Sequence, residues 1–294
     1  MKYKCLSIAG FDCSGGAGIQ ADLKTFSAFG CYGMSILTAM PIQNTCGVNT
    51  CFSIPPQSIS AQLEVLFEDI IPDSIKIGML FSSEVIEIVT EFLKQFAKNI
   101  PIVLDPVMVA RSGDTLLRDT AIDIMKRKLI PLVTVVTPNL QEAYVLAERV
   151  DDMESIARDV LMLGPQAVLL KGGRLDSDDS SDLLLERSGN KTWLTGVRVK
   201  SNNIHGAGCT LSSAICACLS LGFPVQEACR VAKKYLSEAI EASAEYKIGK
   251  GNGPVHHFYH IWPTIHKIYS DNKSQIDNNV SSIYTKNIEK FRRG

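Results

Sequence analysis

Short apolar runs alternate with stretches of helical periodicity along most of the chain. Each run has the length of a strand and is followed by a polar loop and then by apolar residues at helical spacing. The runs are residues 6–9, 75–78, 102–104, 133–136 and 167–170. Continuous apolar strands that alternate with helices are typical of a buried parallel sheet with helices on both faces. The pattern therefore predicts an α/β fold.

Two pairs of strand-like segments depart from this alternation. Residues 34–42 predict a second strand. Residues 48–54, bounded by Gly47 and a Pro-Pro pair, predict a short strand or hairpin arm that forms a small β flap beside the main sheet. Residues 183–186 and 192–199 predict a hairpin. The expected helices cover residues 19–29, 59–70, 85–96, 209–221 and 225–244.

Composition places the chain among ordinary globular proteins. Of its 294 residues, 46% are hydrophobic and 21% charged, and the net charge is −1, so no basic footprint for nucleic acid or an anionic membrane is visible. No stretch approaches the roughly 20 apolar residues of a membrane helix, and the N-terminus lacks the pattern of a signal peptide. We expect one domain over residues 1–263 and a polar, mobile tail over residues 264–294.

The cysteines indicate a reducing compartment. There are nine, an odd number without a CxxC pair, which fits neither a disulfide framework nor a zinc site. Cys216, Cys218, His256 and His257 are also interpreted as structural rather than metal ligands. We therefore expect a cytoplasmic protein whose partner is a small molecule.

Polar residues gather where the predicted strands end. The first strand runs into a glycine-rich loop, and the others end at Gln43, Met79, Asp105, Asn139 and Lys171. Ligands of open parallel sheets bind beyond the carboxyl ends of the strands. These residues therefore predict one composite site.

The glycine-rich loop allows a dinucleotide-binding alternative. Residues 16–21 match the G-x-G-x-x-A pattern between a strand and a helix. Such a site requires an acidic residue about 20 positions further on, and none occurs between Asp22 and Glu64. A nicotinamide oxidoreductase is disfavoured for this reason, and a Walker sequence is also absent.

The corner at residues 205–209 offers another way to handle phosphate. Gly206 and Gly208 allow a tight turn, and the following helix directs its free N–H groups and positive dipole end into that turn. Cys209 at the helix start is expected to have a depressed pKa and to accept the proton of an attacking hydroxyl. The structural alternative is a glycine turn followed by a small buried residue.

Acidic residues near the same edge suggest a metal. Asn139 and Glu142 lie three apart at a helix start, where they either approach a hydrated Mg²⁺ or form a capping box. Asp105 precedes Pro106 after a buried strand and is either a turn-former or a ligand.

Taken together, the motifs resemble the ribokinase-like superfamily and, within it, the hydroxymethylpyrimidine/phosphomethylpyrimidine kinases of thiamine biosynthesis. The resemblance spans about residues 4–262. It is carried by residues 9–25, 43–48, 76–79, 105–108 with 112–114, 137–142, 171–173, 205–211 and 253–257.

The resemblance implies a fold and a set of roles. The fold is a three-layer α/β/α sandwich with a mostly parallel central sheet and a β flap. Cys209 takes the position of the general base, which is an aspartate in most relatives, and the amides of Gly206, Ala207, Gly208 and Cys209 form an anion hole. The other implied roles are substrate binding by Gly10, Asp22, Gln43 and Met79, nucleotide binding by Asn139 and Lys171, and Mg²⁺ binding by Asp105 and Glu142.

The implied reaction is phosphorylation of 4-amino-5-hydroxymethyl-2-methylpyrimidine (HMP) with ATP and Mg²⁺, followed by phosphorylation of the monophosphate. A pyridoxine or pyridoxal kinase is the alternative in the same class. A catalytically silent vitamer-binding protein, an alternative of a different class, is disfavoured because the base, the anion hole and the metal-binding acids are all present. Relatives are commonly homodimers that pair through the flap. Departures from the usual pattern are Phe11, Ala207, Arg111 and Arg174; Phe11 bears on substrate preference.

Overall fold

A single large sheet forms the centre of the computed structural model, which describes residues 2–108, 119–173 and 180–270. Within this part of the chain the sheet has eight strands in the order β10-β9-β8-β7-β6-β5-β1-β2. Pairing is parallel from β2 to β8, and β9 is antiparallel to both of its neighbours. The strands are β1 (Lys4–Ala9), β2 (Tyr32–Leu37), β5 (Ser74–Ile77), β6 (Ile102–Leu104), β7 (Val135–Val136), β8 (Ala167–Leu170), β9 (Asp182–Glu186) and β10 (Lys191–Leu194).

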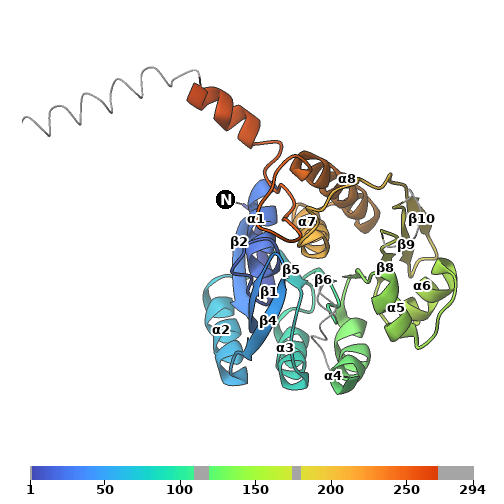
Figure 1. The fold of residues 1–294 in the computed structure, drawn as a ribbon. Helices are drawn as coiled ribbons and strands as arrows, with labels where there is room; N and C mark the ends of the chain where they lie inside the picture. The colour runs from blue at the N-terminus through green and yellow to red at the C-terminus, as the bar shows by residue number, and fades with distance from the viewer. Residues whose placement is uncertain (1, 109–118, 174–179, 271–294) are drawn as a thin grey trace, which may run out of the picture. The chain divides into compact units, whose positions relative to one another are not determined.

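Helices cover both faces of this sheet (Figure 1). One layer consists of α1 (Gly18–Ala28), α7 (Ala207–Ser220) and α8 (Val225–Ser243). The other consists of α2 (Pro56–Asp69), α3 (Ser83–Phe96), α4 (Asp119–Ile124), α5 (Leu140–Ala147) and α6 (Met153–Met162). The helix α4 continues through a π-helical turn, η1 (Met125–Leu129), and a 3₁₀ turn, η2 (Ile130–Leu132). The three-layer α/β/α sandwich expected from the sequence is confirmed.

A separate antiparallel pair, β3 (Ala39–Asn44) and β4 (Gly47–Ser53), forms the flap. The prediction of one strand over residues 34–42 is wrong, because the chain leaves the main sheet at Thr38. The Thr38 hydroxyl is buried and donates to the Met79 carbonyl at 2.5 Å, and the Phe11 amide donates to the Ala39 carbonyl at 2.9 Å. Buried apolar residues lie on both sides of the break, so periodicity alone does not reveal it. The predicted strand 192–199 is also too long, since β10 ends at Leu194.

The core under α2 and α3 follows from their apolar stripes. Ile59, Leu63 and Phe67 recur at helical spacing on α2, and all three are buried against the sheet. On α3 the Ser82 side chain accepts the Val85 amide at 3.3 Å and caps the helix start. The caps and stripes fix where each helix begins and which face it buries.

The chain separates into two compact units, residues 1–257 and 258–294. In the second unit residues 262–270 are helical, and the remainder of the predicted tail lies outside the described residues, as do Arg111, Arg174 and residues 112–114. The division at residue 263 stays a prediction. None of the described helices combines the length and hydropathy that a membrane span requires.

Candidate active site

The site is built on the turn that opens α7. Gly206 is the N-cap residue of α7 and adopts a left-handed conformation, with φ 77° and ψ 9°. A Cβ at this position would lie 1.7 Å from the Gly16 carbonyl oxygen, so both the conformation and the close approach require glycine. No side chain caps α7, and its first turn has no acidic residue. The positive end of the helix is therefore directed at the site.

Cys209 lies in the first turn of α7, where two helix starts meet. The amide of Gly18, the first residue of α1, donates a hydrogen bond to its sulfur. The expected depressed pKa is wrong: burial raises the pKa of the Cys209 thiol to about 11, and the carboxylates of Asp22 and Asp105 act in the same direction. The Lys76 ammonium and the Gly18 amide lower it, but by less. Desolvation is therefore the largest single influence on the Cys209 pKa.

Beneath the corner lies an ion pair without access to solvent. Lys76 Nζ is 2.8 Å from both carboxylate oxygens of Asp22, and both side chains are 0% exposed. The hydroxyls of Ser7 and Ser213 donate to the same carboxylate at 2.6 and 2.7 Å. Burial alone would lower the pKa of Lys76, but Asp22, Cys209 and Asp105 raise it above its ordinary value. The role of Asp22 as a direct substrate contact stays a prediction, since here its carboxylate binds Lys76 and the two serines.

A second ion pair lies beside the α7 turn. Lys171 Nζ is 2.9 Å from Asp105 Oδ1, which also accepts the Thr137 hydroxyl at 3.3 Å. A Cβ on Gly208 would lie 3.1 Å from Asp105 Oδ2 and 3.5 Å from Lys171 Nζ. Burial lowers the pKa of Lys171, and the carboxylates of Asp105 and Glu142 reverse this and raise it. The structure thus brings a carboxylate and a cation from two strand ends to the first turn of α7.

Asn139 and Glu142 form the capping box of α5. The Glu142 amide donates to Asn139 Oδ1 at 3.0 Å, and Glu142 Oε2 accepts the Asn139 amide at 2.8 Å. The backbone of Asn139 also forms an isolated parallel β-bridge with Lys171, so the capping box lies beside the second ion pair. Within the described residues, no three His, Cys, Asp or Glu side chains converge as a metal-binding group. Two carboxylates near a cation suit Mg²⁺ that is held mainly by phosphate oxygens and water.

The residues predicted to bind substrate lie on the flap side of the corner. A Cβ on Gly10 would contact Met79 Sδ at 3.3 Å and the Ala39 carbonyl at 3.6 Å, which places Gly10 and Met79 next to the start of β3. Gln43 is half-buried on β3, and its carbonyl accepts the Cys13 thiol of the glycine-rich loop at 2.8 Å. These contacts bring the flap and the loop together around one site.

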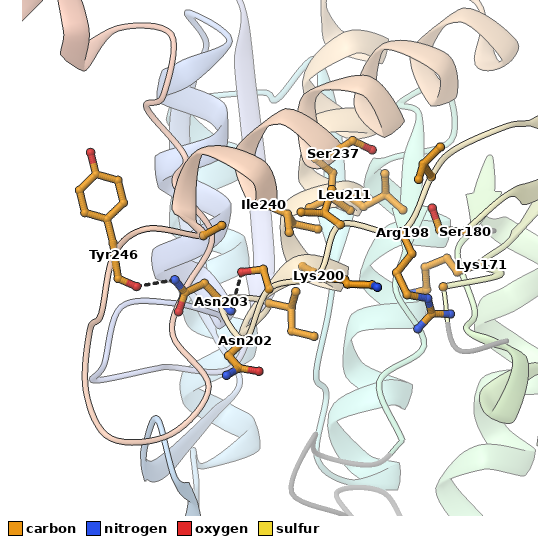
Figure 2. A pocket seen from close by; sticks show the side chains of 18 of the residues that line it. Lys171, Ser180, Arg198, Lys200, Asn202, Asn203, Leu211, Ser237, Ile240 and Tyr246 are labelled. Carbon is orange, nitrogen blue, oxygen red and sulfur yellow. Dashed lines mark hydrogen bonds between the residues drawn. The ribbon is translucent and has the colours of Figure 1, made fainter. Parts of the chain in front are cut away.

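A cavity of about 1030 Å³ adjoins the second ion pair. Its lining includes Asn139 and Lys233, and also Lys171, Arg198 and Lys200, which Figure 2 shows. Its volume is that of a site for a nucleotide-sized ligand. Guanidinium and ammonium groups are the usual partners of phosphate. The cavity reaches Ala207, so it opens beside the first turn of α7.

Several residues that organise the site have no role predicted from the sequence. Lys76 interrupts an apolar strand, and that position is the signal for a buried, paired cation. Asp182 is buried, accepts the Gly172 amide at 2.9 Å and pairs with Lys233 at 2.8 Å. The sequence marks His205 only as part of a motif, whereas in the structure its ring binds Asp12. No sequence signal connects these distant partners.

The sheet with its two helical layers, the flap and the glycine corner at the start of α7 define a ribokinase-like small-molecule kinase. The sequence profile of the phosphomethylpyrimidine kinase family matches residues 12–256. The chain belongs to this family.

Individual relatives support the same placement. A hydroxymethylpyrimidine/phosphomethylpyrimidine kinase of Rhizobium meliloti is 45% identical over 87% of this chain and 97% of its own length. The solved phosphomethylpyrimidine kinase of Clostridium difficile has 42% identity and a TM-score of 0.71, covering 81% of this chain and 100% of its own. A Staphylococcus aureus pyridoxal kinase, solved with AMP-PCP and pyridoxal, has 36% identity and a TM-score of 0.79, covering 88% and 95%.

The buried ion pair generates a stability prediction. Lys76→Met leaves the Asp22 carboxylate buried without its counter-ion, and we expect a loss of about 3–5 kcal/mol in the free energy of unfolding. The matched control is Lys94→Met, which removes a lysine that pairs with Glu91 on the surface at 2.9 Å and should cost about 1 kcal/mol or less. Urea denaturation of both variants measures the difference, and equal losses would contradict the prediction.

Proposed function

We propose that this chain phosphorylates HMP on its hydroxymethyl oxygen with ATP and then phosphorylates the monophosphate to the diphosphate. The observation that carries the proposal is Cys209 in the first turn of α7, between the start of α1 and the buried Lys76–Asp22 pair. Membership of the phosphomethylpyrimidine kinase family supports the substrate class. The names of relatives such as the Rhizobium meliloti kinase support both phosphorylation steps.

In the proposed mechanism, ATP occupies the basic cavity and its γ-phosphoryl group reaches the α7 turn. The free N–H groups of the turn stabilise charge on the equatorial oxygens, and Lys171 adds a counter-charge from the adjacent strand end. Asp105 and Glu142 would hold Mg²⁺, which when bound neutralises the triphosphate and orients it. Such positioning and charge neutralisation account for most of catalysis in phosphoryl transfer.

Gln43, Met79 and Gly10 are proposed to hold the pyrimidine. The Gln43 amide both donates and accepts, as a ring nitrogen and an exocyclic amine require, and Met79 supplies an adaptable apolar wall. The attacking hydroxyl then faces Cys209. Only the thiolate form of Cys209 accepts its proton, and burial makes that form the minor one at neutral pH.

A pyridoxal kinase is the second candidate, favoured by one observation. The Staphylococcus aureus pyridoxal kinase superposes on this chain with a TM-score of 0.79, against 0.71 for the phosphomethylpyrimidine kinase of Clostridium difficile. Sequence identity gives the opposite order, with 36% for the pyridoxal kinase and 42% for the phosphomethylpyrimidine kinase. We give identity more weight, because pocket side chains determine the substrate whereas superposition reports the shared fold.

One assay tests the proposed function. Purified protein is incubated with MgATP and either HMP, HMP phosphate or pyridoxal, and products are followed by mass spectrometry. We expect HMP phosphate and HMP diphosphate to form faster than pyridoxal phosphate. Absence of the diphosphate would contradict the two-step proposal, and a higher kcat/KM for pyridoxal would favour the second candidate.

The role of Cys209 leads to a kinetic prediction. Cys209→Ala should lower kcat by roughly 10² to 10⁴, the contribution of a positioned base, with nearly unchanged ATP affinity. Because the thiol has a pKa of about 11, the single-turnover rate of the unaltered enzyme should rise with pH by up to about tenfold per unit below that value. The alanine variant should lack this slope. An unchanged turnover in Cys209→Ala would remove Cys209 from the mechanism.

We further propose that the protein is a cytoplasmic homodimer that pairs through the flap. Met40, Ile42 and Phe52 expose 37, 40 and 55% of their surface on the two flap strands, and exposed apolar clusters of this kind commonly mark interfaces. All nine cysteines are free thiols, which supports a reducing compartment.

Phe52→Lys should shift the protein to a monomer in sedimentation velocity, whereas Val65→Lys on the exposed side of α2 should not. A dimer that survives Phe52→Lys would contradict pairing through this surface.

A further inference from the structure

A buried carboxylate joins the glycine-rich loop to the α7 corner. Asp12 is 0% exposed and accepts four hydrogen bonds within its own loop: from the Ser14 amide at 3.0 Å, the Ser14 hydroxyl at 2.8 Å, the Gly16 amide at 3.0 Å and the Ala17 amide at 2.7 Å. A fifth comes from His205 Nε2 at 2.8 Å. The loop is thereby organised around one carboxylate that also binds the residue preceding Gly206.

The charge state of this carboxylate fits the bond to His205. Burial by itself would raise the pKa of Asp12, but the hydrogen bonds from His205, Ser14 and Ala17 lower it well below its ordinary value. An ionised carboxylate can only accept hydrogen bonds, so the Nε2–H group of His205 is the donor in this hydrogen bond. The backbone of His205 is held separately, since its amide donates to the Gly253 carbonyl at 2.9 Å. The ring is thus fixed between the loop and the corner.

Around the Asp12–His205 hydrogen bond, the backbone of the glycine-rich loop is in contact with the backbone of the turn that opens α7. The Gly16 carbonyl oxygen occupies the space of a Cβ on Gly206, and a Cβ on Gly16 would lie 2.4 Å from His205 Cδ2. Two residues beyond Gly16, the Gly18 amide reaches the sulfur of Cys209. A shift of the loop relative to the corner would therefore change the surroundings of Cys209 directly.

We propose that Asp12 and His205 are positioning residues that hold the glycine-rich loop in register with the phosphoryl-transfer corner. This inference rests on the proposed function. The loop and flap hold the attacking hydroxyl, and the corner holds the phosphoryl group, so their relative placement sets the attack distance. Misplacement of about 1 Å at this stage can cost about 10²-fold in rate. Neither side chain touches the reacting atoms; both act through the loop backbone.

The kinetic test compares two substitutions of His205. In His205→Gln an amide nitrogen takes the place of Nε2 and can still donate to Asp12, whereas His205→Leu removes the donor. We expect His205→Leu to lower kcat by about 10²-fold with little change in KM for ATP, and His205→Gln to recover kcat to within about tenfold of the unaltered enzyme. His266→Leu, an exposed histidine of the second unit, is the matched control.

Two kinetic outcomes would overturn the proposal. Equal loss in both His205 variants would indicate that the ring transfers a proton, because glutamine retains the hydrogen bond but cannot titrate. Unchanged kcat in His205→Leu would show that the bond does not set the geometry. Thermal unfolding of each variant separates these outcomes from loss of the fold.

A second readout is independent of activity. Hydrogen exchange of the peptides covering residues 12–18 should accelerate in His205→Leu and stay near the unaltered rate in His205→Gln, because the Gly16 and Ala17 amides depend on a fixed Asp12. If the amides of residues 12–18 were equally protected from exchange in the leucine variant and in the unaltered protein, the positioning role of Asp12 and His205 would be overturned. This would hold even if the enzyme accepted another substrate. Failure of the proposed function would instead appear as an inactive unaltered enzyme with the exchange pattern preserved.

Discussion

The arrangement of the site depends on the ion pair between Lys76 and Asp22, which is completely withdrawn from water. The pair joins β5 to α1, and the Ser213 hydroxyl extends the network to α7. Isolated charges at such depth would be strongly destabilising, and only mutual pairing with further hydrogen bonds makes them tolerable. Three elements from distant parts of the chain are therefore held in one geometry. The two helices that meet at Cys209 are both part of this network.

A second buried carboxylate, Asp12, performs a corresponding task between the glycine-rich loop and the α7 turn. Asp12 gathers the amides of the glycine-rich loop and the ring of His205, as Asp22 gathers Lys76 and two hydroxyls. At Asp12 the glycines permit the close approach of the loop to the α7 turn, and the carboxylate fixes it. Glycine supplies the necessary backbone freedom at an entropic cost, so a glycine-rich corner without such an anchor would be poorly ordered. The Asp12 carboxylate thus joins the glycine-rich loop and the α7 turn into one site.

Much of this architecture is readable in the sequence because it obeys local rules. Strand β6 and strand β8 match the apolar runs that predict them, and the capping box of Asn139 and Glu142 follows from residue types three apart. The break at Thr38 and the partners of Lys76 and Asp12 do not follow, since they depend on contacts between residues far apart in sequence. The expected depressed pKa of Cys209 is wrong for the same reason. The helix start is a local feature, whereas the desolvation that dominates comes from tertiary packing.

The raised pKa of Cys209 also suggests why a thiol suits this corner. The carboxylates of Asp22 and Asp105 already lie close enough to Cys209 to raise the pKa of its thiol. Each is paired with one lysine, Asp22 with Lys76 and Asp105 with Lys171. An aspartate in place of Cys209 would add a third negative charge without a third cation, and like charges in a desolvated site oppose one another strongly. A neutral thiol leaves the two ion pairs balanced until substrate arrives. It becomes charged only when it gives up its proton, so burial makes the thiolate scarce at neutral pH and the Lys76 ammonium makes it more abundant.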